Sequence, residues 1–172
     1  MQRPVLFETE RLIHRISSKD EFDTLYAIMA DPGVRRWMGN GEPVPSMKIG
    51  RRLRSDVDQF AKHGAAHGMV IFKENMEVMG YGGVGRYDPE ELDSLELGYQ
   101  FKEQYWGMGI GSEFVKAVVD YGFEKQHAAL IHACAMPENK ASIRVMEKAG
   151  MVFEGYYLET NRNVYYLAKD GR

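Results

Sequence analysis

Apolar residues recur at helical spacing in four stretches of this chain and alternate with polar residues in most of the remainder. The helical spacing predicts one helix that begins at Phe22 and ends before Asp31, and a longer one that carries Ile49 and ends near Lys62. Two more helices are predicted over residues 109–125 and 139–149. Strands are predicted over residues 12–16, 69–72, 78–84, 95–101, 130–135, 152–158 and 164–168. This order of elements is typical of a mixed α/β protein with a strand–helix–strand unit at its centre.

Turn and capping residues mark the ends of several predicted elements. Ser18 and Glu21 fit a capping box ahead of the first helix, and Asp31-Pro32-Gly33 ends that helix. Asn75 is expected to take a positive φ in the turn between the strands at 69–72 and 78–84. The second of these strands is rich in glycine, which indicates that another group approaches its backbone closely.

Size and composition exclude several classes of function. The chain has 172 residues, of which 44% are hydrophobic and 27% charged, so residues 1–172 are expected to form a single domain with a buried core. A net charge of −3 argues against a nucleic-acid partner. No apolar run approaches the roughly 20 residues of a membrane span. The only cysteine, Cys134, is expected to be a small buried side chain, and a cytoplasmic location is the simplest interpretation.

Two short motifs carry the chemistry. Gly107, Gly109 and Gly111 alternate where the helix at 109–125 begins, which leaves bare backbone N–H groups at the positive end of the helix dipole, where a phosphate or pyrophosphate binds well. Asn139 opens the next helix immediately after the strand at 130–135, and Ser142 lies one turn inside it. Asparagine is also a preferred N-cap, a role that is compatible with ligand binding.

Together, Gln104-x-x-Gly107-x-Gly109 and Asn139-x-x-Ser142 resemble the acetyl-CoA-binding core of the GNAT acetyltransferase superfamily. The likeness runs from about Phe7 to Phe153. Thr9-Glu10-Arg11-Leu12-Ile13-His14-Arg15, Glu96-Leu97-Gly98-Tyr99 and Tyr105-Trp106-Gly107 are similar to the RimJ/RimL branch, which acetylates the N-termini of ribosomal proteins. The resemblance implies a GNAT fold: a twisted, mostly antiparallel sheet of six to seven strands with a central parallel βαβ unit, flanked by helices.

The resemblance also implies ligands and partners. Acetyl-CoA is the acetyl donor, and the acceptor is a primary amine, either a protein N-terminus or a small molecule. Neither a metal, a nucleic acid nor a membrane is expected to take part, and the protein is expected to be a monomer or a homodimer. The residues that match the cofactor-binding pattern are Tyr99, Gln100, Phe101, Gln104, Trp106, Gly107, Met108, Gly109, Ile110, Gly111, Ser112, Asn139 and Ser142.

Two residues are the candidates for acid–base chemistry. Glu96 is a carboxylate in the middle of an apolar strand, and the resemblance implies that it is the general base that deprotonates the acceptor ammonium. The structural alternative is a paired or half-exposed strand residue. Met146 replaces the tyrosine that many superfamily members use as general acid, so Ser142 is our candidate for protonating the CoA thiolate.

Other interpretations remain open from the sequence. A non-catalytic acyl-CoA sensor would keep the same groove, whereas a nucleotide-binding protein is disfavoured because no Lys-Ser/Thr follows the glycine turn. The acidic loop at 88–93 either attracts a cationic acceptor or is a solvated connector. The basic run on the helix that carries Ile49, namely Lys48, Arg51, Arg52 and Arg54, is a solvated face or a phosphate contact.

Overall fold

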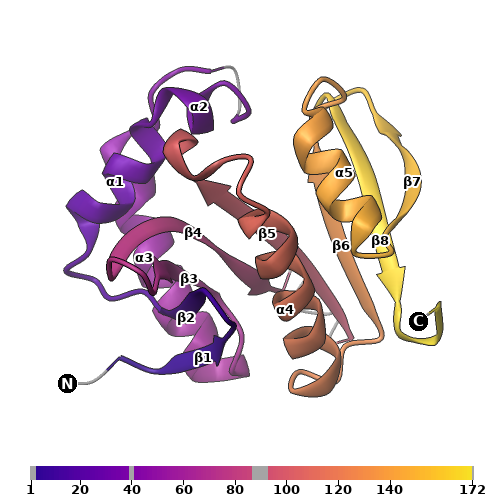
Figure 1. The fold of residues 1–172 in the computed structure, drawn as a ribbon, viewed down its shortest axis with the longest axis horizontal. Helices are drawn as coiled ribbons and strands as arrows, with labels where there is room; N and C mark the ends of the chain where they lie inside the picture. The colour runs from indigo at the N-terminus through magenta and orange to yellow at the C-terminus, as the bar shows by residue number, and fades with distance from the viewer. Residues whose placement is uncertain (1–2, 39–40, 87–92, 172) are drawn as a thin grey trace.

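The computed structural model describes residues 3–38, 41–86 and 93–171 of the chain (Figure 1). The strands are β1 (Val5–Glu8), β2 (Leu12–Ile16), β3 (His67–Phe72), β4 (Glu77–Gly85), β5 (Ser94–Phe101), β6 (Leu130–Ala135), β7 (Val152–Tyr157) and β8 (Arg162–Ala168). The α-helices are α1 (Phe22–Ala30), α2 (Pro32–Arg35), α3 (Ser46–His63), α4 (Ile110–Glu124) and α5 (Lys140–Lys148). Two short 3₁₀ turns are η1 (Glu103–Tyr105) and η2 (Lys169–Gly171).

The described strands form one sheet of eight in the order β1-β2-β3-β4-β5-β6-β8-β7. Neighbouring strands are antiparallel except β5 and β6, which are parallel and joined through α4. The predicted mixed α/β class and its central βαβ unit are therefore confirmed. The additional strand is β1, whose four residues are too few to show a clear alternation of polar and apolar positions.

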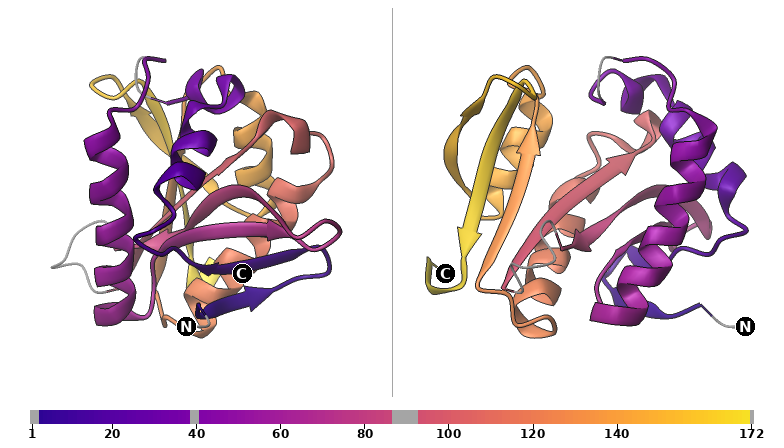
Figure 2. Two further views of the ribbon diagram at one scale, coloured as in Figure 1. Left: turned by 90° about the vertical axis from the view of Figure 1, so that its left-hand side faces the viewer. Right: turned by 180° about the vertical axis from the view of Figure 1, so that it is seen from behind.

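Helices cover the two faces of the sheet separately (Figure 2). On one face, α1 and α3 pack through Leu25, Ile28, Ile49 and Leu53 against Met69 and Tyr81 of the sheet. On the other face, α4 and α5 bury a larger cluster, of which Phe114 and Val118 belong to α4 and Met146 to α5. Each face thus has its own apolar core, because alternate residues of the central strands point to opposite sides.

The predicted capping box is only half formed. The Glu21 carboxylate accepts a hydrogen bond from the Ser18 N–H at 2.8 Å, but the Ser18 hydroxyl contacts Asp20 instead of a helix N–H. Glu21 also binds the guanidinium groups of Arg3 and Arg15, both at 2.6 Å. The expected helix end is confirmed, because α1 stops at Ala30 and the Asp31 carboxylate caps the short helix α2.

In the turn between β3 and β4, the prediction for Asn75 is wrong. Met76 takes the positive φ of 59°, not Asn75. The Asn75 side chain instead accepts a hydrogen bond from the Glu77 N–H at 3.0 Å, which closes the turn from the preceding position. A side chain that binds its own turn does not need the left-handed conformation itself.

The glycines of β4 leave room for neighbouring parts of the chain, as their number predicts. A Cβ on Gly82 would lie 2.7 Å from the Gly98 carbonyl oxygen, and one on Gly83 would lie 2.6 Å from the Ala66 carbonyl oxygen. The His14 ring occupies part of this space, and its Nε2 lies 2.9 Å from the Gly82 carbonyl oxygen. Since a carbonyl only accepts, Nε2 carries the proton and donates.

His14 is held neutral in the core. Its side chain is 1% exposed, and its ring packs on Phe7 and Phe114 with centroid distances of 4.7 and 5.5 Å. Burial lowers its pKa from 6.5 to about 4; the hydrogen bond to Gly82 opposes this shift in part. Between these two pH values the unfolded chain binds the proton more tightly than the folded chain. His14 therefore lowers the stability of the fold as the pH falls from 6.5 to 4.

We predict that His14→Gln makes the free energy of unfolding less dependent on pH in this window. One such group contributes a slope of at most about 1.4 kcal/mol per pH unit, and glutamine retains a donor for the Gly82 carbonyl without titrating. Urea denaturation at several pH values between 4 and 7 measures the slope. His127→Asn is the control, because His127 is exposed and its φ of 54° suits asparagine. Equal slopes in wild type and His14→Gln would contradict the prediction.

Candidate functional site

Strands β5 and β6 separate halfway along the sheet. They pair from Ser94 with Leu130 to Leu97 with Ala133 and no further. On their outer sides, β4 follows β5 as far as Phe101, and β8 follows β6 as far as Ala135. Figures 1 and 2 show the two strands starting together and diverging along their length. The second half of β5 therefore has an edge that faces β6 without pairing with it.

Backbone groups of Tyr99 and Phe101 point toward this open edge. The Lys102 N–H bonds the Met79 carbonyl on β4 at 3.0 Å, and backbone groups alternate between the two edges of a strand. The backbone groups of every second residue counted from Lys102 therefore point toward β4. The backbone groups of Tyr99 and Phe101 point away from β4, toward β6. The Phe101 carbonyl accepts a hydrogen bond from the Trp106 indole N–H at 2.8 Å, as this direction requires. We call this part of β5 the open edge.

The predicted glycine turn lies directly before α4. Gly107 and Gly109 have φ values of 76° and 77°, a conformation that side-chain-bearing residues rarely adopt. A Cβ on Gly107 would meet nothing within 4 Å, so packing within the chain does not require a glycine at this position. No side chain caps the N-terminus of α4. Its first N–H groups are therefore available to an anion, with the helix dipole in the favourable direction.

The N-terminus of α5 carries the second motif. The Asn139 side chain accepts a hydrogen bond from the Ser142 N–H at 3.1 Å, so Asn139 is the N-cap of this helix. The Ser142 hydroxyl lies 2.8 Å from the phenol oxygen of Tyr99. The strand and the helix thus meet through two hydroxyl groups beside the open edge.

Tyr99 remains protonated, because burial raises its pKa to about 12 although the hydrogen bond to Ser142 opposes this shift. Met146, one turn further along α5, is 1% exposed and belongs to the core. A thioether has no proton to donate. A tyrosine hydroxyl near Ser142 is therefore supplied by Tyr99 on β5 and not by position 146 on α5. The motif comparison alone did not indicate this.

Glu96 lies on the opposite face of the sheet from Tyr99. The residues on either side of it, Leu95 and Leu97, are buried in the cluster that contains α4. Strand alternation therefore turns the half-buried Glu96 toward the α3 face. The two candidate catalytic residues therefore lie on opposite faces of the sheet, Glu96 on the α3 face and Ser142 on the α4 and α5 face.

A polar network, in which Tyr81 and Asp56 are buried and Arg52 is half exposed, adjoins Glu96. The Arg52 Nε on α3 donates to the Tyr81 hydroxyl at 2.7 Å, and this hydroxyl donates to the Asp56 carboxylate at 2.5 Å. Burial raises the pKa of Asp56 to about 6, although Tyr81 and Arg52 oppose this shift. Loss of solvation would lower the pKa of Arg52, but its interactions with Tyr81, Asp56 and Glu96 together raise it. Arg52 therefore belongs to this network, while the exposed 47% of its side chain lies on the solvated face expected of the basic run.

Cys134 is exposed, which contradicts its expected burial. It lies on β6 in the half that is separate from β5, where it still pairs with Val164 of β8. Partial burial of the thiol and the nearby Glu96 charge both raise its pKa. Cys134 and Glu96 therefore border the same side of the separated strands.

The other predicted cofactor residues divide into three groups by burial. The side chains of Phe101 and Ile110 are 7% and 1% exposed and belong to the core, so only their backbone can contact a ligand. Gln104, Trp106 and Met108 are exposed around the glycine turn. Gln100 and Ser112 are partly buried, and a Cβ on Gly111 would lie 3.5 Å from a Val145 methyl carbon.

Three residues at the glycine turn were not predicted as site residues. Arg11 binds both the Met108 carbonyl oxygen and the Glu113 carboxylate, and Thr9 binds Glu113 as well. Helical periodicity alone places Glu113 on the solvent side of α4. Its partners are more than 100 residues away in sequence, so no local pattern reveals them.

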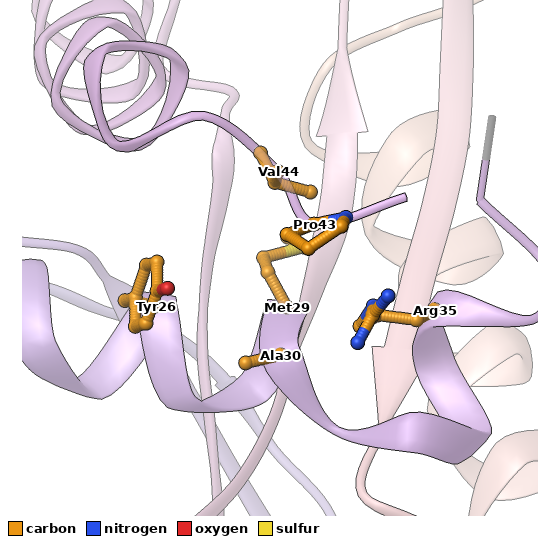
Figure 3. A pocket seen from close by; sticks show the side chains of 6 residues that line it. All are labelled: Tyr26, Met29, Ala30, Arg35, Pro43 and Val44. Atoms are coloured by element: carbon orange, nitrogen blue, oxygen red, sulfur yellow. The ribbon is translucent and has the colours of Figure 1, made fainter. Parts of the chain in front are cut away.

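Part of the predicted acceptor region lies outside the described residues. The acidic loop at 88–93 is described only at Asp93, whose carbonyl accepts a hydrogen bond from the Ala129 N–H at 2.8 Å. A small hollow lined by Tyr26, Met29, Ala30, Arg35, Pro43 and Val44 contains none of the predicted site residues (Figure 3). Among the described residues, no helix is long and apolar enough to cross a membrane. The same part of the chain contains no group of three or more side chains suited to a metal.

Comparison with known proteins identifies the family. The family model described as an acetyltransferase (GNAT) domain matches residues 11–152. The chain belongs to the GNAT acetyltransferase family. It is 32% identical over 148 residues to "Uncharacterized N-acetyltransferase p20" of Bacillus licheniformis, which covers 86% of this chain and 82% of the relative. The RimJ/RimL likeness is supported at a distance by a 27% identity to the ribosomal protein uS5-alanine N-acetyltransferase of Escherichia coli, over 67% of this chain and 57% of that protein.

Solved structures agree with this assignment. RimL, a ribosomal L7/L12 α-N-protein acetyltransferase in complex with coenzyme A, superimposes with a TM-score of 0.80 at 14% identity, covering 98% of this chain and all of RimL. At this identity the match shows a shared GNAT fold and does not transfer a substrate.

Proposed function

We propose that this GNAT protein transfers an acetyl group from acetyl-CoA to a primary amine by direct attack in a ternary complex. The observation that carries the proposal is the separation of β5 from β6, with a hydroxyl pair on one face and a carboxylate on the other. The donor binds on the face of α4 and α5, and the acceptor enters from the face of α3. A cytoplasmic setting and a monomeric or homodimeric state remain predictions.

The turn before α4 fits a pyrophosphate. Gly107 and Gly109 hold positive φ angles, the Cβ position of Gly107 is open, that of Gly109 meets only the Arg11 Nη2 at 3.6 Å, and the helix N-terminus lacks a side-chain cap. Gln104 is uncharged, so backbone N–H groups supply most of the contact expected of this motif. The pantetheine arm would then run along the open edge of β5, toward Asn139 and Ser142.

The open edge also suits the thioester. The Phe101 carbonyl is already occupied by Trp106, but the backbone groups of Tyr99 point toward the space between the strands. A backbone N–H in this position polarises the thioester carbonyl and stabilises the oxyanion of the tetrahedral intermediate. Holding the amine and the thioester together supplies much of the rate increase.

Proton transfer occurs on the two faces in turn. Glu96, directly or through a water molecule, accepts a proton from the acceptor ammonium, and the free amine then attacks the carbonyl carbon. When the C–S bond breaks, the attacking nitrogen releases its second proton to water and the Ser142 hydroxyl passes its proton to the thiolate; the Ser142 oxygen then regains a proton from water. Tyr99 stays protonated and donates to the Ser142 oxygen, which leaves the Ser142 proton free to point at sulfur.

An assay with acetyl-CoA and a panel of amines tests the proposal. The panel contains peptides with free N-termini, diamines and small amines, because the fold does not specify the acceptor. Release of CoA that depends on an amine, with acetylated product detected by mass spectrometry, is the expected result. Binding of acetyl-CoA without turnover across the panel would support the alternative, a non-catalytic acyl-CoA sensor.

We predict that Gly109→Val weakens CoA binding by more than tenfold. Valine at a φ of 77° is strained, and its side chain enters the space assigned to the pyrophosphate. Gly41→Val is the matched control, because Gly41 has a φ of 81° and open space around it but lies outside the site. Calorimetric titration with CoA measures both. Wild-type affinity in Gly109→Val would refute the assignment of the turn.

Glu96→Gln is predicted to lower turnover by about 10²- to 10⁴-fold, the usual worth of general base catalysis, while leaving the acetyl-CoA affinity nearly unchanged. The loss should shrink at high pH, where the amine deprotonates in solution. Glu8→Gln, which changes a half-exposed carboxylate bonded to Lys73, is the control. Full turnover of Glu96→Gln across the pH range would return Glu96 to a structural role.

Ser142→Ala and Tyr99→Phe are each predicted to lower turnover less than Glu96→Gln does, because a CoA thiolate is already a tolerable leaving group. The double variant should be no slower than Ser142→Ala alone, since Tyr99 acts through the Ser142 hydroxyl. Steady-state kinetics of the three variants at one acceptor concentration measures this. Multiplicative losses would show that the two hydroxyls act independently.

A further inference from the structure

The segment just before β2 contacts the glycine turn through Arg11. The Arg11 Nη1 donates to the Met108 carbonyl oxygen at 2.8 Å. The Arg11 Nη2 lies 3.6 Å from the position that a Cβ would take on Gly109. Met108 stands between the two glycines with positive φ. A cationic side chain from the start of the chain is therefore built into the turn where Gln104 supplies no charge.

Glu113, in the first turn of α4, is the second half of this arrangement. Its carboxylate accepts hydrogen bonds from the Arg11 Nε at 2.7 Å, from the Arg11 backbone N–H at 3.0 Å and from the Thr9 hydroxyl. Partial burial would raise its pKa, but the Thr9 and Arg11 hydrogen bonds outweigh burial and lower it. Glu113 therefore remains negatively charged beside the helix end at which an anion would bind.

The Arg11 segment is itself held in place. The Lys73 N–H donates to the Arg11 carbonyl at 2.8 Å, and the Lys73 ammonium donates to the Thr9 carbonyl at 2.7 Å. The Leu12 N–H in turn donates to the Thr9 hydroxyl at 3.0 Å. The backbone that carries Arg11 is thus held by Leu12 and Lys73, and its guanidinium is held by Glu113 and Met108, so little ordering is required when a ligand arrives.

A carboxylate in the first turn of a helix is favourable when the site is empty, but it repels a bound phosphate. We propose that Arg11 is a positioning residue for the CoA pyrophosphate. It neutralises Glu113, and it holds the Met108 carbonyl so that the N–H groups of the turn face the ligand. Its Nη2 supplies the cationic contact that Gln104 lacks. This inference rests on the proposed function, because it specifies how the same donor site recognises its ligand.

Calorimetric titration with CoA and with dephospho-CoA tests the proposal. Dephospho-CoA keeps the pyrophosphate and lacks only the 3′-phosphate. Arg11→Ala is expected to lower the affinity for both ligands equally, by about 10- to 100-fold, which is the contribution of one charge-assisted hydrogen bond. The CoA affinity of Arg11→Lys should lie between those of wild type and Arg11→Ala. Lysine keeps the charge but lacks the forked guanidinium that reaches both Met108 and Glu113.

The second variant pair separates electrostatics from folding. Glu113→Gln in the Arg11→Ala background should recover part of the lost affinity, because it removes the uncompensated carboxylate. A merely structural loss would not recover in this way. Arg3→Ala is the matched control. The Arg3 side chain is 34% exposed, against 35% for Arg11, and it also pairs with a glutamate. That glutamate, Glu21, precedes α1 and lies away from the glycine turn. Arg3→Ala should bind CoA as wild type does.

The outcomes distinguish this inference from the proposed function. Unchanged CoA affinity in Arg11→Ala overturns the inference alone, as does a loss that disappears with dephospho-CoA, which would place Arg11 at the 3′-phosphate. No recovery in the double variant refutes the neutralising role of Arg11. Wild-type protein that binds neither ligand would remove the proposed function and this inference with it. Thermal melting of each variant verifies that the titrated protein is folded.

Discussion

The loss of pairing between β5 and β6 is the constraint on which the rest of the structure depends. A strand in the middle of a sheet normally satisfies its backbone groups on both sides, and beyond Leu97 β5 does so only toward β4. Trp106 satisfies one exposed carbonyl, that of Phe101, and the remaining groups of the open edge are available to a ligand. The parallel βαβ connection makes this possible, since α4 joins the two strands at a distance and no tight hairpin holds them together.

The separated strands give the two faces of the sheet different chemistry. On the face of α4 and α5, the proton-bearing groups are neutral hydroxyls, Tyr99 and Ser142, and burial raises the Tyr99 pKa to about 12. On the face of α3, the network of Arg52, Tyr81 and Asp56 is charged and lies beside Glu96. In the proposed function the donor is a neutral thioester and the acceptor is a cationic amine. Each therefore suits the charge of the face to which it is assigned. One strand, β5, supplies residues to both faces because its side chains alternate.

The residues that sequence analysis identified correctly belong to local motifs. Asn139 caps α5, Gly107 and Gly109 adopt the backbone that their motif requires, and the order of elements around α4 is as predicted. The misjudged positions depend on side-chain contacts that the motifs do not specify. The Asn75 side chain bonds its own turn while Met76 takes the positive φ, and the Ser18 hydroxyl contacts Asp20 instead of a helix N–H. Cys134 is exposed on β6, beyond the point at which this strand stops pairing with β5.

The sequence by itself determined the family, the periodicity of the helices and strands and the two motifs beside the proposed donor site, because each of these is written in residues close together in the chain. Only the tertiary structure decided which distant groups meet. It placed Tyr99 against Ser142 where Met146 has no proton to give, and Arg11 against Met108 and Glu113. Such pairs depend on strand register and helix packing, which are set by the whole core, so no pattern within one segment encodes them.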